Sequence, residues 1–344
     1  MARHALKGFL NELVGSGAVS AAAAVVGDGR TIAQEAAGGM KRPGPAGRVT
    51  TSSLFDLASL TKPVSATLAL ALDRRRRLSL STTIAGALRG TDVRVAPELR
   101  RRQLATLLRQ RAGFQAWAPL YHHWTRPSDM LEGLISSASF LGAAPSTYSD
   151  LGFMAWAGIA EAVTGRDFAT LVRRQVARPL GLSRLAGPPG DTPAVVECRL
   201  GTDREVSLAR AQGIRVRRLR APGPGRIQDG NARFLGGPSG HAGLFGSARA
   251  IWRLTREWAR PRVLFGETAV EVALGGSGAY ALGWQRRPAA AAKRSGLWYG
   301  HTGFTGGGVW FCPDTTEIRV LLTHRSSVSV SLNEWQARFL GLRF

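Results

Sequence analysis

The fold is decided by a short stretch near the N-terminus, Leu54-Phe-Asp-Leu-Ala-Ser59-Leu-Thr-Lys62-Pro63. The apolar spacing that follows predicts a helix from Ser59 to about Arg77, and Pro63 fits such a helix only within its first turn. Ser59 and Lys62 then share one face, with backbone N–H groups near the hydroxyl and the amine in an apolar wall that would make it a usable base. By itself this S-x-x-K spacing is weak, because a solvated lysine at a helix N-terminus explains it equally well.

Two further motifs supply groups that could act with this pair. Ser-Thr-Tyr148-Ser-Asp150 precedes a predicted helix; a tyrosine hydroxyl beside an amine can relay protons, and a polar side chain two residues later can orient that amine. Tyr-Gly-His301-Thr302-Gly303-Phe lies between a strand pattern and a glycine-rich segment. Glycines there let a substrate lie against a strand edge, where His301 and Thr302 would offer hydrogen bonds.

With these three motifs in order, the chain resembles the serine hydrolases related to class C β-lactamases, D-alanyl-D-alanine carboxypeptidases and the esterases of that fold. The middle motif has the Y-x-N-like form of class C relatives. The resemblance covers residues 5–344 and includes further blocks in family order, among them R-R-L-S-L-S-T-T-I, L-A-T-L-L-R-Q-R-A-G-F, R-P-L-G-L and G-G-P-S-G-H-A-G-L-F-G-S. A chance match over so many blocks is implausible.

The resemblance implies a role for each matching residue. Ser59 would be the acylated nucleophile and Lys62 its partner in proton transfer. Tyr148 would protonate the leaving group and later activate the deacylating water. The backbone N–H groups of Ser59 and Phe304 would form the oxyanion hole, where loss of one donor typically costs about 3 kcal/mol of transition-state stabilisation.

Three departures from the family pattern bear on the substrate. His301 replaces a lysine that helps to hold a substrate carboxylate, and Asp150 replaces a commoner asparagine, which favours a protonated Lys62 if the aspartate is ionised. Residues 109–113 read R-Q-R-A-G where relatives often have H-T-S-G, close to the rim of the site. These changes favour an esterase or peptidase over a dedicated β-lactamase. We also expect Thr302, Gly303 and His241 of the G-H-A-G block to contact substrate, with a simple turn at His241 as the alternative.

The order of the predicted elements indicates an α+β fold of the β-lactamase and penicillin-binding-protein type. Strand patterns at both ends of the chain predict one antiparallel sheet flanked by helices, with a mainly helical lobe inserted between them. We predict a single catalytic domain over 1–344, with a sheet lobe at about 1–90 and 240–344 and a helical lobe at about 91–239. Individual expectations include strands over 18–38, 280–285, 296–301, 308–311 and 317–323, an extended surface loop over 212–240, a helix capped by Ser247, and a closing helix with a Ser331–Glu334 capping box.

The charge of the chain is unusual, at +23 over 344 residues and 36.7 kDa. Hydrophobic residues make up 44% and charged residues 20%, which excludes a largely disordered chain. All but four of the 46 basic residues are arginines, a skew that a GC-rich coding sequence also produces. No nucleic-acid-binding motif accompanies them, so nonspecific nucleic-acid binding is only a remote alternative and we expect no nucleic-acid partner.

The termini and the cysteines bear on the compartment. Asn11 and Glu12 interrupt the apolar stretch of a would-be export signal, and no run of about 18 uncharged apolar residues occurs that would span a membrane. Cys198 and Cys312 are too few for a disulfide framework and lack metal-site spacing. We therefore expect a cytoplasmic protein without metal or cofactor.

The leading hypothesis is a serine hydrolase that works through an acyl-enzyme on an ester, an amide or peptide, or a β-lactam. The alternative is a non-catalytic protein of the same fold that binds peptidoglycan-like peptides or β-lactams. The sequence leaves the natural substrate and the oligomeric state open.

Overall fold

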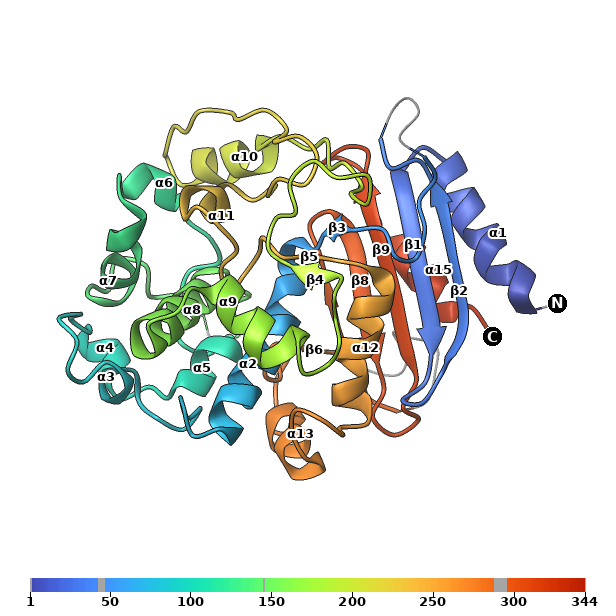
Figure 1. Cartoon of the computed structure of the whole chain (residues 1–344). Helices are drawn as coiled ribbons and strands as arrows, with labels where there is room; N and C mark the ends of the chain where they lie inside the picture. Colours follow the sequence, from blue (N-terminus) through green and yellow to red (C-terminus); the bar gives the residue numbers. More distant parts are fainter. Residues whose placement is uncertain (1, 43–46, 145, 288–295, 344) are drawn as a thin grey trace.

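A sheet with helices on both faces lies at one side of the molecule and a group of helices at the other (Figure 1). The computed structural model describes residues 2–42, 47–144, 146–287 and 296–343. The sheet is antiparallel, with strand order β2-β1-β9-β8-β7-β6. Its strands are β1 Val19–Gly27, β2 Ile32–Gly39, β6 Gln285–Arg287, β7 Trp298–Thr302, β8 Gly306–Phe311 and β9 Ile318–Arg325. Since β1 pairs with β9, the predicted sheet from both chain ends is confirmed.

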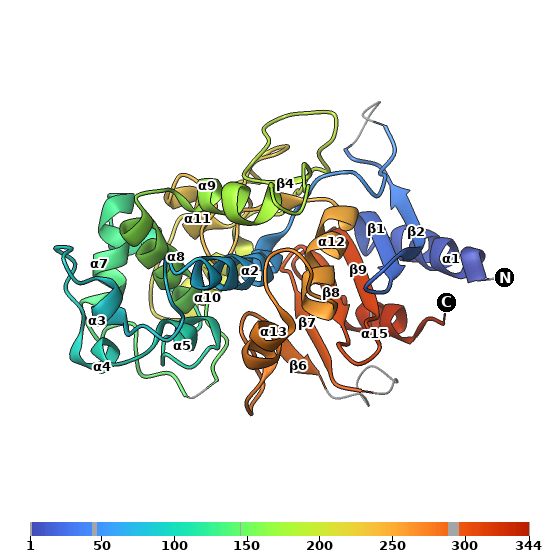
Figure 2. The same ribbon diagram turned by 60° about the horizontal axis from the view of Figure 1, so that its bottom comes forward.

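The central strand β1 shows why both faces of the sheet are covered. Successive side chains of a strand point to opposite faces, and nearly all of those in β1 are buried. Ala21, Ala23 and Val25 pack into the core that α12 shares, whereas Ala22 and Ala24 pack with α1 and α15. Figure 2 shows α12 on one side of the sheet and α1 and α15 on the other. These helices span α1 Ala2–Gly15, α12 Ala248–Ala259 and α15 Asn333–Gly341.

A second, three-stranded sheet was not expected from the sequence. It has the order β3-β5-β4, and its strands are β3 Phe55–Asp56, β4 Leu185–Ala186 and β5 Phe245–Gly246. Strands of two residues carry no periodic pattern, so they form only because distant segments meet. Its strand β3 leads into the 3₁₀ turn Ala58–Leu60 and then into helix α2.

Helix α2, Thr61–Arg74, stands between the sheet and the helical lobe, and every side chain from Thr61 to Leu72 is buried. It is therefore buried on all sides, as an interior helix is, although Thr61, Lys62, Ser65 and Thr67 are polar. The helical lobe comprises α3 Ile84–Ala87, α4 Pro97–Arg100, α5 Leu104–Leu108, α6 Leu120–His123, the 3₁₀ turn Pro127–Asp129, α7 Met130–Ile135, α8 Leu151–Thr164, α9 Phe168–Val172, the turn Arg173–Ala177, α10 Asp203–Ala211 and α11 Gly230–Phe234. Helix α13, Glu267–Leu274, follows α12.

Several local predictions require correction. The predicted Ser331–Glu334 capping box is wrong. Helix α15 begins at Asn333, so its N-cap residue is Leu332, whose side chain makes no capping hydrogen bond. The expected strand over 280–285 is reduced to an isolated bridge between Tyr280 and Gln285, where β6 starts. The segment 212–240 is not simply a surface loop, since it contains α11, whose residues Gly230, Asn231 and Ala232 are buried. By contrast, the cap at Ser247 is confirmed by its hydrogen bond from the Ala250 N–H.

In the part of the chain that the structure describes, none of the helices combines the length and the apolar character needed to cross a lipid bilayer.

Candidate active site

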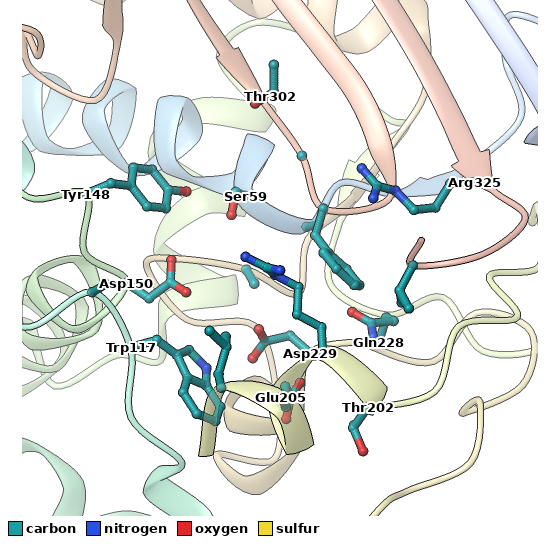
Figure 3. A pocket seen from close by; sticks show the side chains of 18 of the residues that line it. Ser59, Trp117, Tyr148, Asp150, Thr202, Glu205, Gln228, Asp229, Thr302 and Arg325 are labelled. Carbon is teal, nitrogen blue, oxygen red and sulfur yellow. The ribbon is translucent and has the colours of Figure 1, made fainter. Parts of the chain in front are cut away.

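A cavity of about 550 Å³ lies where α2, the helical lobe and the end of β7 meet (Figure 3). Ser59 lines it, together with Tyr148 and Asp150 from the start of α8 and Thr302, Gly303 and Phe304 from the end of β7. The structure thus brings most of the residues expected from three distant motifs to one place. The remaining wall comes from segments that the sequence did not single out, among them Trp117, Thr202, Arg204, Glu205, Gln228, Asp229 and Arg325.

The backbone before Ser59 is held in a strained turn. Ala58 has a φ of 46°, a left-handed conformation that is uncommon for a residue with a Cβ. The buried Asp56 stabilises this turn, because its carboxylate accepts hydrogen bonds from the N–H groups of Ala58 and Gln228, each at 2.8 Å. Burial raises the pKa of Asp56 to about 6 against the effect of these two bonds. Asp56 therefore connects the turn before Ser59 to the segment at Gln228, which lines another part of the cavity.

Lys62 lies beneath Ser59 with its amine fully buried. Its Nζ donates to Ser59 Oγ at 3.1 Å and to Asp150 Oδ1 at 2.5 Å. Burial opposes the positive charge, but Asp150 and Tyr148 outweigh it and raise the pKa of Lys62 to about 12. The expectation that desolvation leaves Lys62 neutral, so that it can act as a base, is therefore wrong. Lys62 is a cation at neutral pH, as the aspartate at position 150 had indicated.

Tyr148 and Asp150 owe their positions to the loop that leads into α8. The Gln110 side chain accepts from the Ser149 N–H at 2.9 Å, and the Ser149 hydroxyl donates to the Gln115 carbonyl at 2.6 Å. Asp150 takes the N-cap position of α8 but makes no side-chain cap, because its carboxylate points to Lys62. Burial raises the pKa of Tyr148, while interactions with Lys62 and Ser59 act in the opposite direction.

The end of β7 brings Thr302, Gly303 and Phe304 to the cavity beside Ser59. Gly303 favours a close approach there, since a Cβ would lie only 3.0 Å from the carbonyl oxygen of Leu57. The backbone of this strand end therefore lies close to the turn before Ser59. Ser59 and Phe304, whose N–H groups are the expected oxyanion donors, both line the cavity.

His301 is buried behind the strand end and does not line the cavity. Its Nδ1 lies 2.9 Å from the Thr302 carbonyl and donates to it, which fixes the tautomer. Burial, with the nearby charge of Lys62, lowers the pKa of His301 to about 3. At neutral pH His301 is uncharged, so it cannot replace the cation that the family uses at this position.

His241 is also buried and away from the cavity, so the expected contact with substrate is not seen. Its ring Nε2 lies 3.0 Å from Asp229 Oδ1, and its carbonyl accepts a hydrogen bond from Lys62 at 3.4 Å. The preceding Gly240 packs so tightly that a Cβ would overlap the carbonyl of Phe153. His241 thus supports the wall of the cavity, and it is Asp229 that faces the interior.

The sequence matches the family model described as Beta-lactamase over residues 6–342. The chain belongs to the beta-lactamase family. Members of this family are serine hydrolases that include esterases, peptidases and β-lactamases. Family membership therefore agrees with the fold and with the resemblance seen in the sequence.

Solved structures share this fold over nearly the whole chain. EstCE1, a hydrolase with promiscuous acyltransferase activity, superposes with a TM-score of 0.77 at 17% identity, covering 98% of this chain and 97% of its own. SurE gives 0.73 at 22% identity, with coverage of 99% and 76%. A class C beta-lactamase from Rhodobacter sphaeroides gives 0.72 at 17% identity, with 97% of both chains covered. No relative was found among curated proteins. Identities this low establish the fold alone.

The far wall of the cavity carries ionisable residues that sequence reasoning missed. Asp229 and Glu205 lie near each other there, and Arg325 points in from the end of β9 (Figure 3). The segment containing Asp229 had been assigned to a surface loop, although aspartate is a preferred N-cap residue: Asp229 accepts from the Ala232 N–H and caps α11. Nothing local to the sequence marks Glu205 or Arg325, because they reach the cavity only through the fold.

Metal ligation is not indicated by the geometry. Over the described ranges, no three His, Cys, Asp or Glu side chains are grouped so that they could hold a metal ion. Both cysteines are buried and unpaired.

Proposed function

We propose that the protein is a serine hydrolase that cleaves an ester or amide through an acyl-enzyme on Ser59. The observation that carries this proposal is the position of Lys62 Nζ, 3.1 Å from Ser59 Oγ, beside Tyr148 and at the edge of a substrate-sized cavity. We further propose that the whole chain acts as one catalytic unit on small molecules, with no nucleic-acid partner.

Acylation would begin with attack of Ser59 Oγ on the carbonyl carbon of the substrate. Lys62 is protonated and cannot take the serine proton, so we assign that role to Tyr148. As the Tyr148 oxygen accepts this proton, its own hydroxyl proton passes to the leaving group, and the C–O or C–N bond breaks. Burial raises the pKa of Tyr148, which suits a relay through a neutral phenol. Lys62 stabilises negative charge that develops on Ser59 and Tyr148.

The carbonyl oxygen would gain negative charge in the tetrahedral intermediate. The backbone N–H groups of Ser59 and Phe304 are the proposed donors to it. Deacylation would run the same relay in reverse order. A water attacks the acyl carbon as Tyr148 accepts a proton from it, and Ser59 regains its proton as the acid is released.

The neutral state of His301 favours esters and peptides over β-lactams and D-Ala-D-Ala substrates. The family lysine at this position helps to hold a substrate carboxylate, and a buried histidine with a pKa of about 3 supplies no charge there. A substrate anion on that side would lose a charge-assisted hydrogen bond, which is typically stronger than a neutral one.

A fluorophosphonate probe tests the nucleophile directly. Wild-type protein should be labelled, whereas Ser59→Ala should not, and Ser128→Ala serves as control because Ser128 is exposed and away from the cavity. Folded wild-type protein that takes no label, or Ser59→Ala that takes label equally, overturns the proposal.

A substrate panel then distinguishes the activities. We expect a short-chain p-nitrophenyl ester to be turned over faster than a chromogenic cephalosporin or a D-Ala-D-Ala peptide, and only when Ser59 is present. Cephalosporin turnover far above ester turnover would reverse the preferred substrate class. If these compounds acylate Ser59 but none of the resulting acyl-enzymes is measurably hydrolysed, the result would instead favour the non-catalytic binding protein.

A further inference from the structure

Two arginine side chains face the cavity without a carboxylate partner. Arg325 is the last residue of β9 and points into the cavity, and Arg204 of α10 also lines it (Figure 3). Among the described residues, neither guanidinium takes part in an ion pair, and the Arg325 Nε is buried without a hydrogen-bond acceptor. Burial and the nearby charge of Arg204 both lower the pKa of Arg325. Two cations thus repel each other at one end of the cavity.

The acidic groups of the cavity do not neutralise these arginines, because each has other partners. Asp150 pairs with Lys62. Glu205 accepts hydrogen bonds from the Gly230 N–H and from the Tyr121 hydroxyl, at 2.8 and 2.9 Å. Asp229 pairs with His241. Among the described residues, none of these carboxylates forms an ion pair with Arg204 or Arg325, so two unpaired cations lie at the Arg325 end of the cavity.

This positive end lies on the side of the nucleophile away from the leaving group. In Figure 3 Ser59 stands between Tyr148 and Arg325. Tyr148 is the proposed proton donor to the leaving group, so the leaving group occupies its side. The Arg325 guanidinium lies 5.4 Å from the centre of the Phe304 ring, and the backbone N–H of Arg325 donates to the Thr305 carbonyl at 2.8 Å. Arg325 is thus fixed next to the proposed oxyanion donor.

We propose that the acyl part of the substrate carries a carboxylate, which binds between Arg325 and Arg204. The substrate class is then a monoester or monoamide of a dicarboxylic acid, or a larger acyl group with an anion at similar reach. A carboxylate there would accept charge-assisted hydrogen bonds from the guanidinium groups and relieve their repulsion. This inference rests on the proposed acyl-enzyme at Ser59, but it concerns a separate part of the cavity.

A matched pair of esters tests the inference. Mono-4-nitrophenyl glutarate has a free carboxylate, whereas its methyl ester has the same chain without the charge. Wild-type kcat/KM should favour the free acid by about 10- to 100-fold, the range for a hydrogen bond between charged groups. The preference should shrink as salt is added, because Arg204 is exposed to solvent.

Variants locate the preference in the cavity. Arg325→Gln should lower the ratio of kcat/KM for the free acid to kcat/KM for the methyl ester at least tenfold. Arg204→Gln should have a smaller effect in the same direction, and Arg325→Lys should retain part of the preference. Arg126→Gln is the control, since Arg126 is exposed and lies outside the cavity.

The outcomes separate this inference from the proposed function. If wild-type protein cleaves both esters equally, or if Arg325→Gln leaves the ratio unchanged, the inference is overturned while the hydrolase remains. If Arg126→Gln lowers the ratio as much as Arg325→Gln, the preference comes from the overall charge and the inference is again overturned. If neither ester is cleaved and the probe does not label Ser59, the proposed function fails and the inference fails with it.

Discussion

Lys62 and His301 approach the same tyrosine from two different elements, and the fold makes one a cation and leaves the other neutral. Lys62 Nζ lies 4.8 Å from the centre of the Tyr148 ring, and the His301 ring lies 5.8 Å from it, centre to centre. Both side chains are buried. Yet the pKa of Lys62 is raised to about 12, whereas that of His301 is lowered to about 3.

The difference teaches that burial alone does not decide the charge of a basic group. Desolvation disfavours the cation at both positions, and it would make either group neutral if it acted alone. Asp150 reverses the outcome for Lys62, because its carboxylate lies 2.5 Å from Nζ. His301 has no carboxylate partner among the described residues, and the charge of Lys62 lowers its pKa further. Asp150 thus decides the charge of Lys62, whereas burial decides that of His301.

Of the variants that test this difference, the one that removes the Lys62 cation should have the largest effect on activity. We expect Lys62→Met to lower kcat/KM for an ester by about 10²- to 10⁴-fold, the range for loss of a group that assists proton transfer. The exposed Lys7→Met is the matched control and should remain near wild type. Activity of Lys62→Met within tenfold of wild type, in protein shown to be folded, would remove Lys62 from the mechanism.

Asp150→Asn should make Lys62 lose its positive charge more readily while keeping its side chain. Without the carboxylate, burial lowers the pKa of Lys62, so its proton is lost at a lower pH. If the protonated lysine is needed, kcat/KM of the variant should fall as pH rises from about 7 to 10, by roughly tenfold or more, while the wild-type profile stays flat. Asp129→Asn, which removes a surface carboxylate, is the control. Superimposable profiles for Asp150→Asn and wild type would show that Asp150 does not set the charge of Lys62.

His301 should contribute the smallest effect, a dependence of stability on pH. The pKa of His301 is about 3 in the folded protein and near 6.5 in the unfolded chain, so between these values only the unfolded chain binds the proton. This contribution is fully present above about pH 6.5 and is lost as the pH falls, with a slope approaching 1.4 kcal/mol per pH unit (about one proton). Asp56 and Glu205, whose pKa values are raised to about 6 and about 7, act with the opposite sign.

A comparison of variants isolates the histidine from these carboxylates. Urea unfolding at pH 7, 6, 5 and 4 should show the wild-type free energy of unfolding falling relative to that of His301→Gln as the pH decreases. The exposed His122→Gln should run parallel to wild type. Parallel curves for His301→Gln as well would mean that His301 is protonated in the folded state.

The sheet and the main helices could be predicted because their signals are local. The strands β1 and β2 flank a G-D-G turn, and Ser247 caps α12 as expected. The errors fall where long-range contacts override local pattern. Leu332 replaces Ser331 at the start of α15, and the two-residue strands of the small sheet exist only because β3, β4 and β5 meet.

The motifs identified residues of the candidate site but did not establish their protonation states. Ser59, Tyr148 and Asp150 meet at one cavity as their motifs predicted. His241 does not reach it, because the tight packing of Gly240 keeps the ring behind the wall.

The sequence by itself determined the family, the strand patterns at the two chain ends and the residue types around Ser59, because these depend on local spacing and chemistry. The tertiary structure decided that Asp150 lies against Lys62, that His301 is neutral, and that Arg325 and Arg204 line the cavity without an ion-pair partner among the described residues. Charge depends on burial and on partners within a few ångströms, and such neighbours come from distant parts of the chain.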